Sequence, residues 1–321
     1  MQSKPRLLVT RRFPGAVMER IGRDYQARHN PGDRGLTAEE LGELGRGCDA
    51  LLCAPGDALD ARGIAALPAS VRALATFSVG YDHIDVEAAR TRGLAVFNTP
   101  DVLTDATAEI ALLLMLGASR RAWEGQRMLR AGDWTGWTPT QLLGRGLSSK
   151  RLGILGMGRI GQAVARRARG FGVEIHYCNR NRLPAEREAG ATYHAAPESL
   201  LGVSQIFSLH CPATPETQRF LDRERIALLP PDPIVINTAR GAVVDDAALI
   251  EALRSGRVAA AGLDVFEDEP DVNPDYLSLP NAYLLPHLGS ATVEARNAMG
   301  LLALDNLDAF FAGREPPARV V

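Results

Sequence analysis

Short apolar runs alternate along the chain with longer segments of mixed polarity. The runs have the length and composition of strands buried on both faces, and the segments between them repeat apolar positions at helical spacing. In the first third of the chain the predicted strands are residues 6–10, 50–53, 73–77 and 95–97, and the predicted helices are 15–22, 37–45 and 86–92. This alternation predicts a parallel sheet with helices on both faces, ending near Asn98.

The same alternation begins again at Lys150. The predicted strands of this second region are residues 152–155, 173–178, 206–209, 234–237, 259–263 and 282–285. A long apolar helix (104–121) and a polar segment with tryptophans (123–143) separate the two regions. A last helix (292–312) follows the second set of strands, and we expect it to pack back on the first region because the second sheet is already complete.

The first strand of the second region runs into a glycine-rich turn, Gly156-Met157-Gly158-Arg159-Ile160-Gly161, and then into a helical segment. The order strand, G-x-G-x-x-G, helix is typical of a dinucleotide site. The glycines allow a tight turn, a close approach of backbone to a pyrophosphate, and close helix–strand packing. The phosphates would face the unpaired N–H groups at the positive end of the helix. The alternative is a tight strand-to-helix turn without a ligand.

The end of the next strand indicates which dinucleotide is bound. A Rossmann site usually carries an acid there that holds the adenine ribose, about 20 residues after the glycines, and this chain has Asn179 at that position. Arg180 and Arg182 follow, and two guanidinium groups could bind a 2′-phosphate. The sequence therefore favours NADP(H) over NAD(H). The alternative is that both arginines are solvated and that Asn179 binds the ribose weakly.

Composition excludes several classes of protein. The 321 residues are 46% hydrophobic and 23% charged with a net charge of −2, which suits a globular protein of two domains without a nucleic-acid partner. The most apolar segment (110–116) is too short to span a membrane, and Arg11 and Arg12 interrupt any signal-peptide core. Four cysteines without a C-x-x-C pair indicate buried thiols, and no metal, in a reducing compartment. We expect a cytoplasmic protein.

Three polar residues of the second region follow predicted strands, where ligands of open α/β sheets bind. They are Arg240, Glu269 and His287. These residue types suit the reduction of a 2-oxo acid: the Arg would bind the substrate carboxylate, the His would protonate the carbonyl oxygen, and the acid would orient the His and raise its pKa. Taken one at a time, Arg240 could be a surface arginine, Glu269 an exposed acid and His287 a structural histidine.

Several segments, together with the glycine motif, carry a family resemblance: residues 78–85, 210–214, 237–241, 261–270 and 286–292. In their order and spacing they resemble the D-2-hydroxyacid dehydrogenases, and most closely the glyoxylate/hydroxypyruvate reductase branch. The resemblance implies two Rossmann-like, doubly wound parallel-sheet α/β domains with a cleft between them. Residues 1–98 with 288–321 would form the substrate-binding domain, and residues 99–287 the dinucleotide-binding domain.

The resemblance also implies roles for single residues. Arg240, Glu269 and His287 would be the catalytic residues, and Val79 and Gly80 would give backbone N–H groups to the substrate carboxylate. Besides Asn179 and Arg180, the residues implied to bind the dinucleotide are Thr107, Gly156, Gly158, Arg159, Ile160, Gly161, Cys211, Pro212, Thr217, Thr238, Ala239, Asp264, His287 and Gly289. In the alternative, Gly80 serves a turn, Thr107 begins a helix and Asp264 caps the turn after it.

The resemblance further implies a homodimer, with the helix of residues 104–118 and the segment 123–146 as its interface; the alternative is that this helix is core. Trp134 and Trp137 could shape the substrate pocket or pack in that interface. The predicted reaction is reduction of glyoxylate, hydroxypyruvate or both to the D-2-hydroxy acid with NADPH. The alternatives are an NADH-dependent D-2-hydroxyacid dehydrogenase for another 2-oxo acid, and a dinucleotide-sensing scaffold of the corepressor type.

Overall fold

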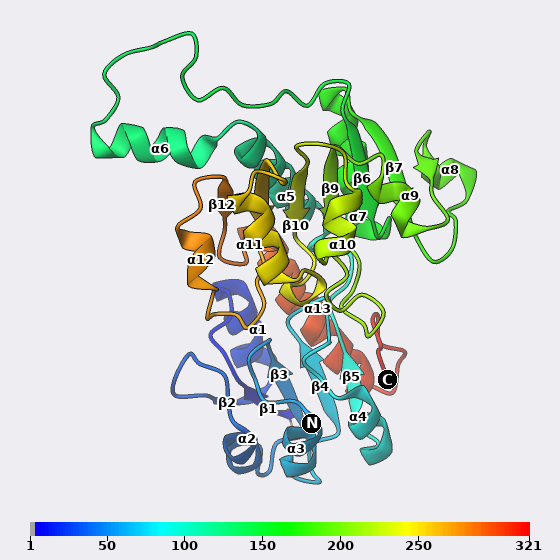
Figure 1. The fold of residues 1–321 in the computed structure, drawn as a ribbon. Coiled ribbons are helices and arrows are strands. Elements are labelled where there is room, and N and C mark those ends of the chain that lie inside the picture. Colours follow the sequence, from blue (N-terminus) through cyan, green and yellow to red (C-terminus); the bar gives the residue numbers. More distant parts are fainter. Residues whose placement is uncertain (1–3) are drawn as a thin grey trace. The chain divides into compact units, whose positions relative to one another are not determined.

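The computed structural model describes residues 4–321, which form two compact units (Figure 1). One unit ends at Leu103 and resumes over Ala291–Val321, and the other is Thr104–Ser290. Each unit has one sheet in which every pair of neighbouring strands is parallel, with helices on both faces. The predicted fold class, two doubly wound α/β domains, is confirmed.

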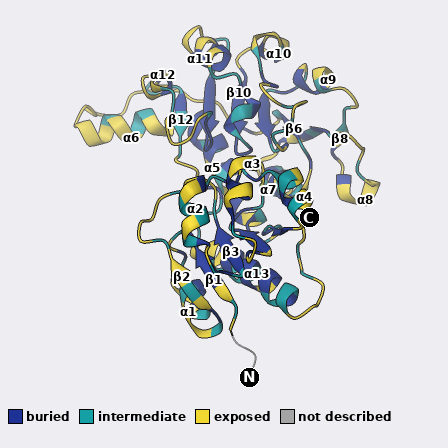
Figure 2. Ribbon diagram, turned by 90° about the horizontal axis from the view of Figure 1, so that it is seen from below, coloured by how far each residue is buried: buried dark blue, intermediate teal, exposed yellow. Residues whose placement is uncertain are grey.

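The first unit is built on a sheet in the order β2-β1-β3-β4-β5. Its strands are β1 (Arg6–Val9), β2 (Gln26–His29), β3 (Ala50–Cys53), β4 (Ala73–Thr76) and β5 (Ala95–Phe97). All the predicted strands are present, but β2 was not predicted, because it lies at the sheet edge and has no apolar run. All residues of β3, β4 and β5 are buried, and β3 is dark blue in Figure 2.

Two layers of helices cover this sheet. The helices α2 (Ala38–Leu44), α3 (Ala61–Ala66) and α4 (Val86–Arg92) pack on one face. The helices α1 (Gly15–Asp24) and α13 (Val293–Phe311) pack on the other face, so the end of the chain completes the core begun by its first strands. Asp60, Asp85 and Thr292 each begin a helix by accepting a hydrogen bond from a backbone N–H of its first turn.

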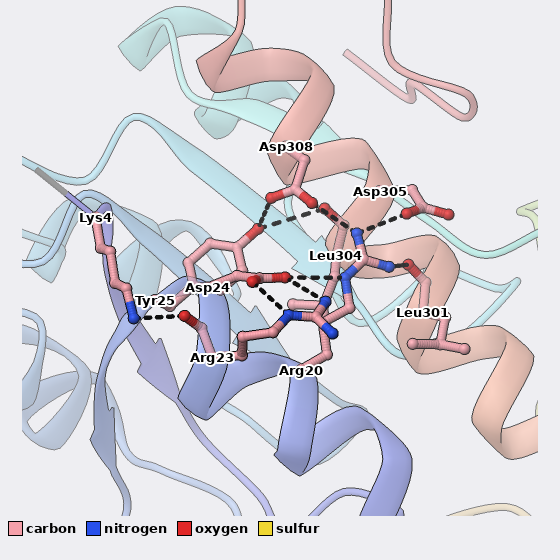
Figure 3. A network of polar contacts seen from close by, with 9 residues as sticks. All are labelled: Lys4, Arg20, Arg23, Asp24, Tyr25, Leu301, Leu304, Asp305 and Asp308. Carbon is pink, nitrogen blue, oxygen red and sulfur yellow. Dashed lines mark hydrogen bonds and ion pairs between the residues drawn. The ribbon is translucent and has the colours of Figure 1, made fainter. Parts of the chain in front are cut away.

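Polar contacts join α1 to α13 (Figure 3). The Arg20 guanidinium, in a side chain only 17% exposed, lies 2.7 Å from the Asp305 carboxylate and 2.6 Å from the Asp308 carboxylate. The Tyr25 hydroxyl donates a hydrogen bond to Asp308, and burial together with this carboxylate raises the pKa of Tyr25 well above its usual value. These contacts fasten together two segments that are far apart in the sequence.

The second unit has a seven-stranded sheet in the order β12-β11-β10-β9-β6-β7-β8. Its strands are β6 (Arg151–Leu155), β7 (Glu174–Cys178), β8 (Thr192–Tyr193), β9 (Ile206–Leu209), β10 (Ile234–Asn237), β11 (Ala260–Leu263) and β12 (Ala282–Leu284). The six predicted strands are present with ends displaced by at most one residue, whereas β8 is too short to show a pattern. The strand order reverses beside β6, where open α/β sheets bind ligands.

The helices α5 (Thr104–Ser119) and α7 (Arg159–Ala168) pack on one face of this sheet, and α9 (Pro197–Leu201), α10 (Arg223–Leu228) and α11 (Asp246–Arg254) pack on the other. The short helix η1 (Arg169–Phe171) directly continues α7. Three other short elements follow strands: α8 (Ala185–Glu188), η2 (Gly241–Val243) and α12 (Pro274–Leu277). A Cβ at Gly262 of β11 would lie 2.9 Å from the Leu114 backbone oxygen, so α5 lies directly on the strands.

The segment between α5 and β6 contains a helix that was not predicted, α6 (Ala122–Ala131). No residue of α6 is buried, and the helix extends from the unit as an arm (Figures 1 and 2). The side chains of Trp134 and Trp137, which follow it, are 51% and 77% exposed. No helix within residues 4–321 is long and apolar enough to cross a membrane.

Candidate active site

The glycine turn after β6 has the geometry that a dinucleotide pyrophosphate requires. Gly156 has φ +94°, and a Cβ on it would lie 2.6 Å from the backbone nitrogen of Cys211, so the position accepts only glycine. A Cβ on Gly161 would lie 2.3 Å from the Gly156 oxygen, so this glycine lets α7 approach β6 closely. Gly158, at the start of α7, faces open space and gives no side-chain cap. The N–H groups of the first helical turn are therefore open to an anion. The residues of this turn fit the pyrophosphate of a dinucleotide.

Three residues after β7, Asn179, Arg180 and Arg182, were considered as cofactor contacts, and the structure gives them different surroundings. The Asn179 side chain accepts a 2.6 Å hydrogen bond from the Met157 N–H, so it holds the glycine turn in shape. Arg182 makes a two-pronged ion pair with Glu188, at 2.8 and 3.0 Å, and this pair is the main reason that the pKa of Glu188 falls to about 2. Arg180 is exposed; the pKa of Glu216 is lowered mainly by a hydrogen bond with Thr214 and, to a smaller extent, by the Arg180 charge. Of the two arginines, which are both exposed, Arg182 is therefore paired within the protein.

The loop after β9 lies against the glycine turn. Cys211 is buried, and burial raises the pKa of its thiol to about 11. The Thr217 hydroxyl donates to the Pro212 oxygen at 2.7 Å and accepts from the Thr214 N–H at 2.8 Å, so Thr217 shapes this loop. His210 is a residue of the loop to which the sequence analysis gave no role.

The His210 ring makes two hydrogen bonds, one with the Ser208 hydroxyl at 2.7 Å and one with the Thr238 hydroxyl at 3.3 Å. Burial lowers its pKa to about 4, so the ring is neutral near pH 7. It links the loop after β9 to the turn after β10. The sequence did offer a sign of this residue: His210 directly follows an apolar strand, and Arg240 and His287 were found because they also follow strands.

A tight turn after β10 presents Arg240. The buried Asn237 side chain accepts from the Ala239 N–H and donates to the Arg240 oxygen, both at 2.9 Å. Gly241 allows the next step, because a Cβ there would lie 1.8 Å from the Phe266 carbonyl carbon. The turn of Arg240 is thus packed against the loop that carries Glu269.

Asp264, at the end of β11, organises the loop after β12. Its buried carboxylate accepts hydrogen bonds from the Leu288 N–H at 2.6 Å and the Gly289 N–H at 2.7 Å. Burial raises the pKa of Asp264 although these amides act to lower it. A Cβ on Gly289 would lie 3.4 Å from the Thr107 hydroxyl, so Thr107, Asp264 and Gly289 meet at one place. The Asp264 carboxylate therefore binds the loop after β12, and not the turn that directly follows Asp264 in the sequence.

His287 and Glu269 form the closest pair of the site. The Glu269 carboxylate lies 2.6 Å from His287 Nδ1 and accepts, through its other oxygen, a 2.8 Å hydrogen bond from the Phe266 N–H. The backbone of His287 has φ +53°, a left-handed conformation that is uncommon for residues other than glycine, and its N–H donates to the Asp264 oxygen at 2.9 Å. The loop therefore holds the imidazole against the carboxylate.

Charge in this group of residues favours a protonated imidazole. The Glu269 hydrogen bond raises the pKa of His287 above its usual value, against the opposing effects of burial and of the Arg240 charge. Burial acts to raise the pKa of Glu269, but the His287 hydrogen bond and the nearby Arg240 charge outweigh it and lower that pKa. Within the second unit, the structure thus brings together the guanidinium of Arg240, the carboxylate of Glu269 and the imidazole of His287.

Val79 and Gly80 lie in the first unit, in the loop that follows β4. Neither backbone N–H donates a hydrogen bond to any of residues 4–321. Two successive free amides can bind a carboxylate. No group of three or more His, Cys, Asp or Glu side chains in the described chain is arranged to hold a metal.

Comparisons with known proteins agree with this geometry. Residues 112–289 match the family model described as D-isomer specific 2-hydroxyacid dehydrogenase, NAD binding domain. A glycerate dehydrogenase of Hyphomicrobium methylovorum is 44% identical over 98% of both chains. A glyoxylate reductase of Thermococcus litoralis is 45% identical over 98% of this chain and 96% of its own.

The fold is also found in a solved structure. An NADPH-dependent glyoxylate/hydroxypyruvate reductase of Sinorhizobium meliloti, solved in complex with NADP and malonate, superimposes with a TM-score of 0.89. The two sequences are 36% identical, over 99% of this chain and 97% of the other.

Proposed function

Because the chain belongs to the D-isomer specific 2-hydroxyacid dehydrogenase family and is therefore an NAD(P)-dependent oxidoreductase of 2-oxo acids, we propose that it reduces glyoxylate and hydroxypyruvate with NADPH. The observation that carries the proposal is the 2.6 Å contact between His287 and Glu269 in the neighbourhood of Arg240. The names of the relatives, glyoxylate reductase, glycerate dehydrogenase and NADPH-dependent glyoxylate/hydroxypyruvate reductase, support the choice of substrates and coenzyme.

In the proposed mechanism His287 is the proton donor. Since its Nδ1 is bound to Glu269, its Nε2 is the nitrogen left to give a proton to the substrate carbonyl oxygen. Glu269 favours the charged imidazole before the proton is transferred and keeps the ring oriented. When bound, the reduced dinucleotide supplies the hydride for the carbonyl carbon.

The substrate carboxylate is assigned to Arg240 and to the amides of Val79 and Gly80. A guanidinium can bind a carboxylate through two parallel hydrogen bonds, and its charge also stabilises the oxygen that becomes negative during reduction. The two amides suit the same anion because they have no acceptors within residues 4–321. We accordingly assign substrate binding to residues 1–98 with 288–321, and dinucleotide binding to residues 99–287.

We assign the dinucleotide to the glycine turn and to the loops that surround it. The first turn of α7 would bind the pyrophosphate through backbone N–H groups, and Thr107, Asp264 and Gly289 would lie near the nicotinamide. The remaining residues proposed at this site are Arg159, Ile160, Asn179, Cys211, Pro212, Thr217, Thr238 and Ala239. The preference for NADPH rests on Arg180, because Arg182 is held by Glu188 and no acid ends β7.

We also propose that the chain forms a homodimer through α5, α6 and the segment after it. The supporting observation is that α6 has no buried residue, while Trp123 and Leu129 on it are 42% and 63% exposed. A helix with uncovered apolar side chains is stabilised when a second surface covers them. Light scattering should give the mass of two chains, and the mass of one chain at all concentrations would refute the dimer.

The proposed function is tested by initial rates with glyoxylate and hydroxypyruvate, each with NADPH and with NADH. Rapid oxidation of NADPH and slow oxidation of NADH would support the substrates and the coenzyme. A preference for NADH would refute the role given to Arg180 and leave the reaction in place. Dinucleotide binding without turnover of either acid would refute both substrates and favour a sensing scaffold.

A further inference from the structure

In the loop after β4, three successive carbonyl groups accept hydrogen bonds from the protein. The Ser78 oxygen accepts from the Thr99 N–H at 3.0 Å, the Val79 oxygen from the Asn98 side chain at 2.8 Å, and the Gly80 oxygen from the Ser78 hydroxyl at 2.6 Å. The N–H groups of Val79 and Gly80 have no acceptor among residues 4–321. The three oxygens are therefore bound by the protein, and the two N–H groups are left to bind an anion.

Peptide geometry connects these two facts. In a trans peptide the C=O and N–H of one unit point in opposite directions. The unit that contains the Val79 oxygen also contains the Gly80 nitrogen, so the hydrogen bond from Asn98 sets the direction of the Gly80 N–H. The bond from the Thr99 N–H to the Ser78 oxygen does the same for the Val79 N–H. Of these two anchors, only Asn98 uses a side chain, which substitution can remove.

Asn98 is itself held from the other side. It follows β5 directly and is half-buried, and its backbone oxygen accepts a 3.2 Å hydrogen bond from the side chain of Asn306 on α13. Asn306 is fully buried, and its own side-chain oxygen accepts from the Ala318 N–H at 2.7 Å. Two amide side chains in series therefore connect the final segment of the chain to the loop after β4.

We propose that Asn98 is a positioning residue for the substrate: by binding the Val79 oxygen it aims the Gly80 N–H at the substrate carboxylate, and Asn306 holds it in place. This inference rests on the proposed function, in which the Val79 and Gly80 amides bind that carboxylate. An aspartate side chain at residue 98 has the same shape but no N–H donor, and its negative charge would repel the Val79 oxygen. The peptide would lose its anchor and the carboxylate one aligned donor.

The test is Asn98→Asp, assayed with glyoxylate and with oxamate, an unreactive isostere of a 2-oxo acid. Since a hydrogen bond to a charged group is at stake, we expect the KM for glyoxylate and the inhibition constant of oxamate both to rise about tenfold or more. The KM for NADPH and the kcat at saturating glyoxylate should stay within about twofold, because transition-state contacts at the carbonyl are unchanged.

Asn281→Asp is the matched control. Asn281 also donates from its side chain to backbone oxygens, of Leu253 at 3.1 Å and Ala259 at 3.2 Å, but it lies before β12 in the other unit. This variant should lose stability without a change in either constant. If Asn98→Asp does not fold, Asn98→Ser, which keeps a shorter donor, should show a smaller rise in both constants.

Two results would overturn the proposal, and they are distinguishable. If the wild-type protein reduces glyoxylate but the Asn98 variants keep its KM and the oxamate constant, Asn98 has no positioning role and the proposed function stands. If the wild-type protein neither reduces glyoxylate nor binds oxamate, the proposed function fails and the role of Asn98 fails with it.

Discussion

Glu269→Gln would test the link between the carboxylate and the imidazole. The carboxylate serves two donors, because one oxygen accepts from the Phe266 N–H at 2.8 Å and the other lies 2.6 Å from His287 Nδ1. A glutamine has one acceptor oxygen. If that oxygen keeps the Phe266 N–H, the amide NH₂ group faces His287 Nδ1 and opposes its protonation.

The size of the effect follows from that contact. A hydrogen bond between charged groups contributes about 1.5–3 kcal/mol, which corresponds to a loss of roughly 10- to 150-fold in kcat/KM for glyoxylate. The direction with pH also follows. Reduction needs the protonated imidazole, and Glu269 raises the pKa of His287, so kcat/KM should be full at low pH and fall as pH rises through that pKa. In the variant the fall should move to lower pH.

The assay is the rate of NADPH oxidation with glyoxylate as a function of pH. Glu267→Gln is the matched control, because Glu267 is a neighbouring acid that contacts Arg219 at 3.2 Å. It should leave both the rate and the pH profile unchanged. A Glu269→Gln variant with the wild-type profile would refute the account of how His287 is charged.

Other substitutions test the remaining parts of the structure. Arg180→Ala should raise the KM for NADPH about tenfold, through loss of a charged phosphate contact, and leave the KM for NADH unchanged; Arg187→Ala is the control, and equal effects on both coenzymes would exclude the phosphate role. Gly156→Ala should abolish dinucleotide binding in a fluorescence titration, because φ is +94° and a Cβ would collide with the Cys211 backbone; binding at the wild-type level would contradict the geometry of the turn. Arg20→Ala should lower the free energy of unfolding by about 1–3 kcal/mol, since two carboxylates lose their partner. The control is Arg23→Ala, because the Arg23 side chain is exposed. Equal denaturant midpoints for Arg20→Ala and Arg23→Ala would show that the contacts between α1 and α13 contribute little.

Most of the fold could be predicted because parallel strands buried on both faces are apolar runs, which are visible without a structure. The elements that were missed lack such a run. The edge strand β2 reads Gln26-Ala27-Arg28-His29, and β8 has two residues; both are strands because a neighbour pairs with them. The arm helix α6 was missed as well; its large apolar residues are only Trp123, Met128 and Leu129, and none of its residues is buried.

The residues of the site could be predicted from their places after strands, but their contacts could not. The hydrogen bond from Met157 to Asn179 and the diversion of Arg182 to Glu188 depend on where side chains reach once the loops are folded. The bond from Asn98 to the Val79 oxygen joins the ends of two neighbouring strands, and the sequence carries no sign of it.

The most direct test of the central claim, that this chain reduces a 2-oxo acid with His287 as the proton donor, is turnover and NADPH affinity measured together in His287→Ala. The account predicts a loss of turnover with glyoxylate of about a hundredfold or more, the usual contribution of a general acid, with a dissociation constant for NADPH close to that of the wild-type protein. Unchanged turnover would contradict the account, because some other group would then have to protonate the carbonyl oxygen.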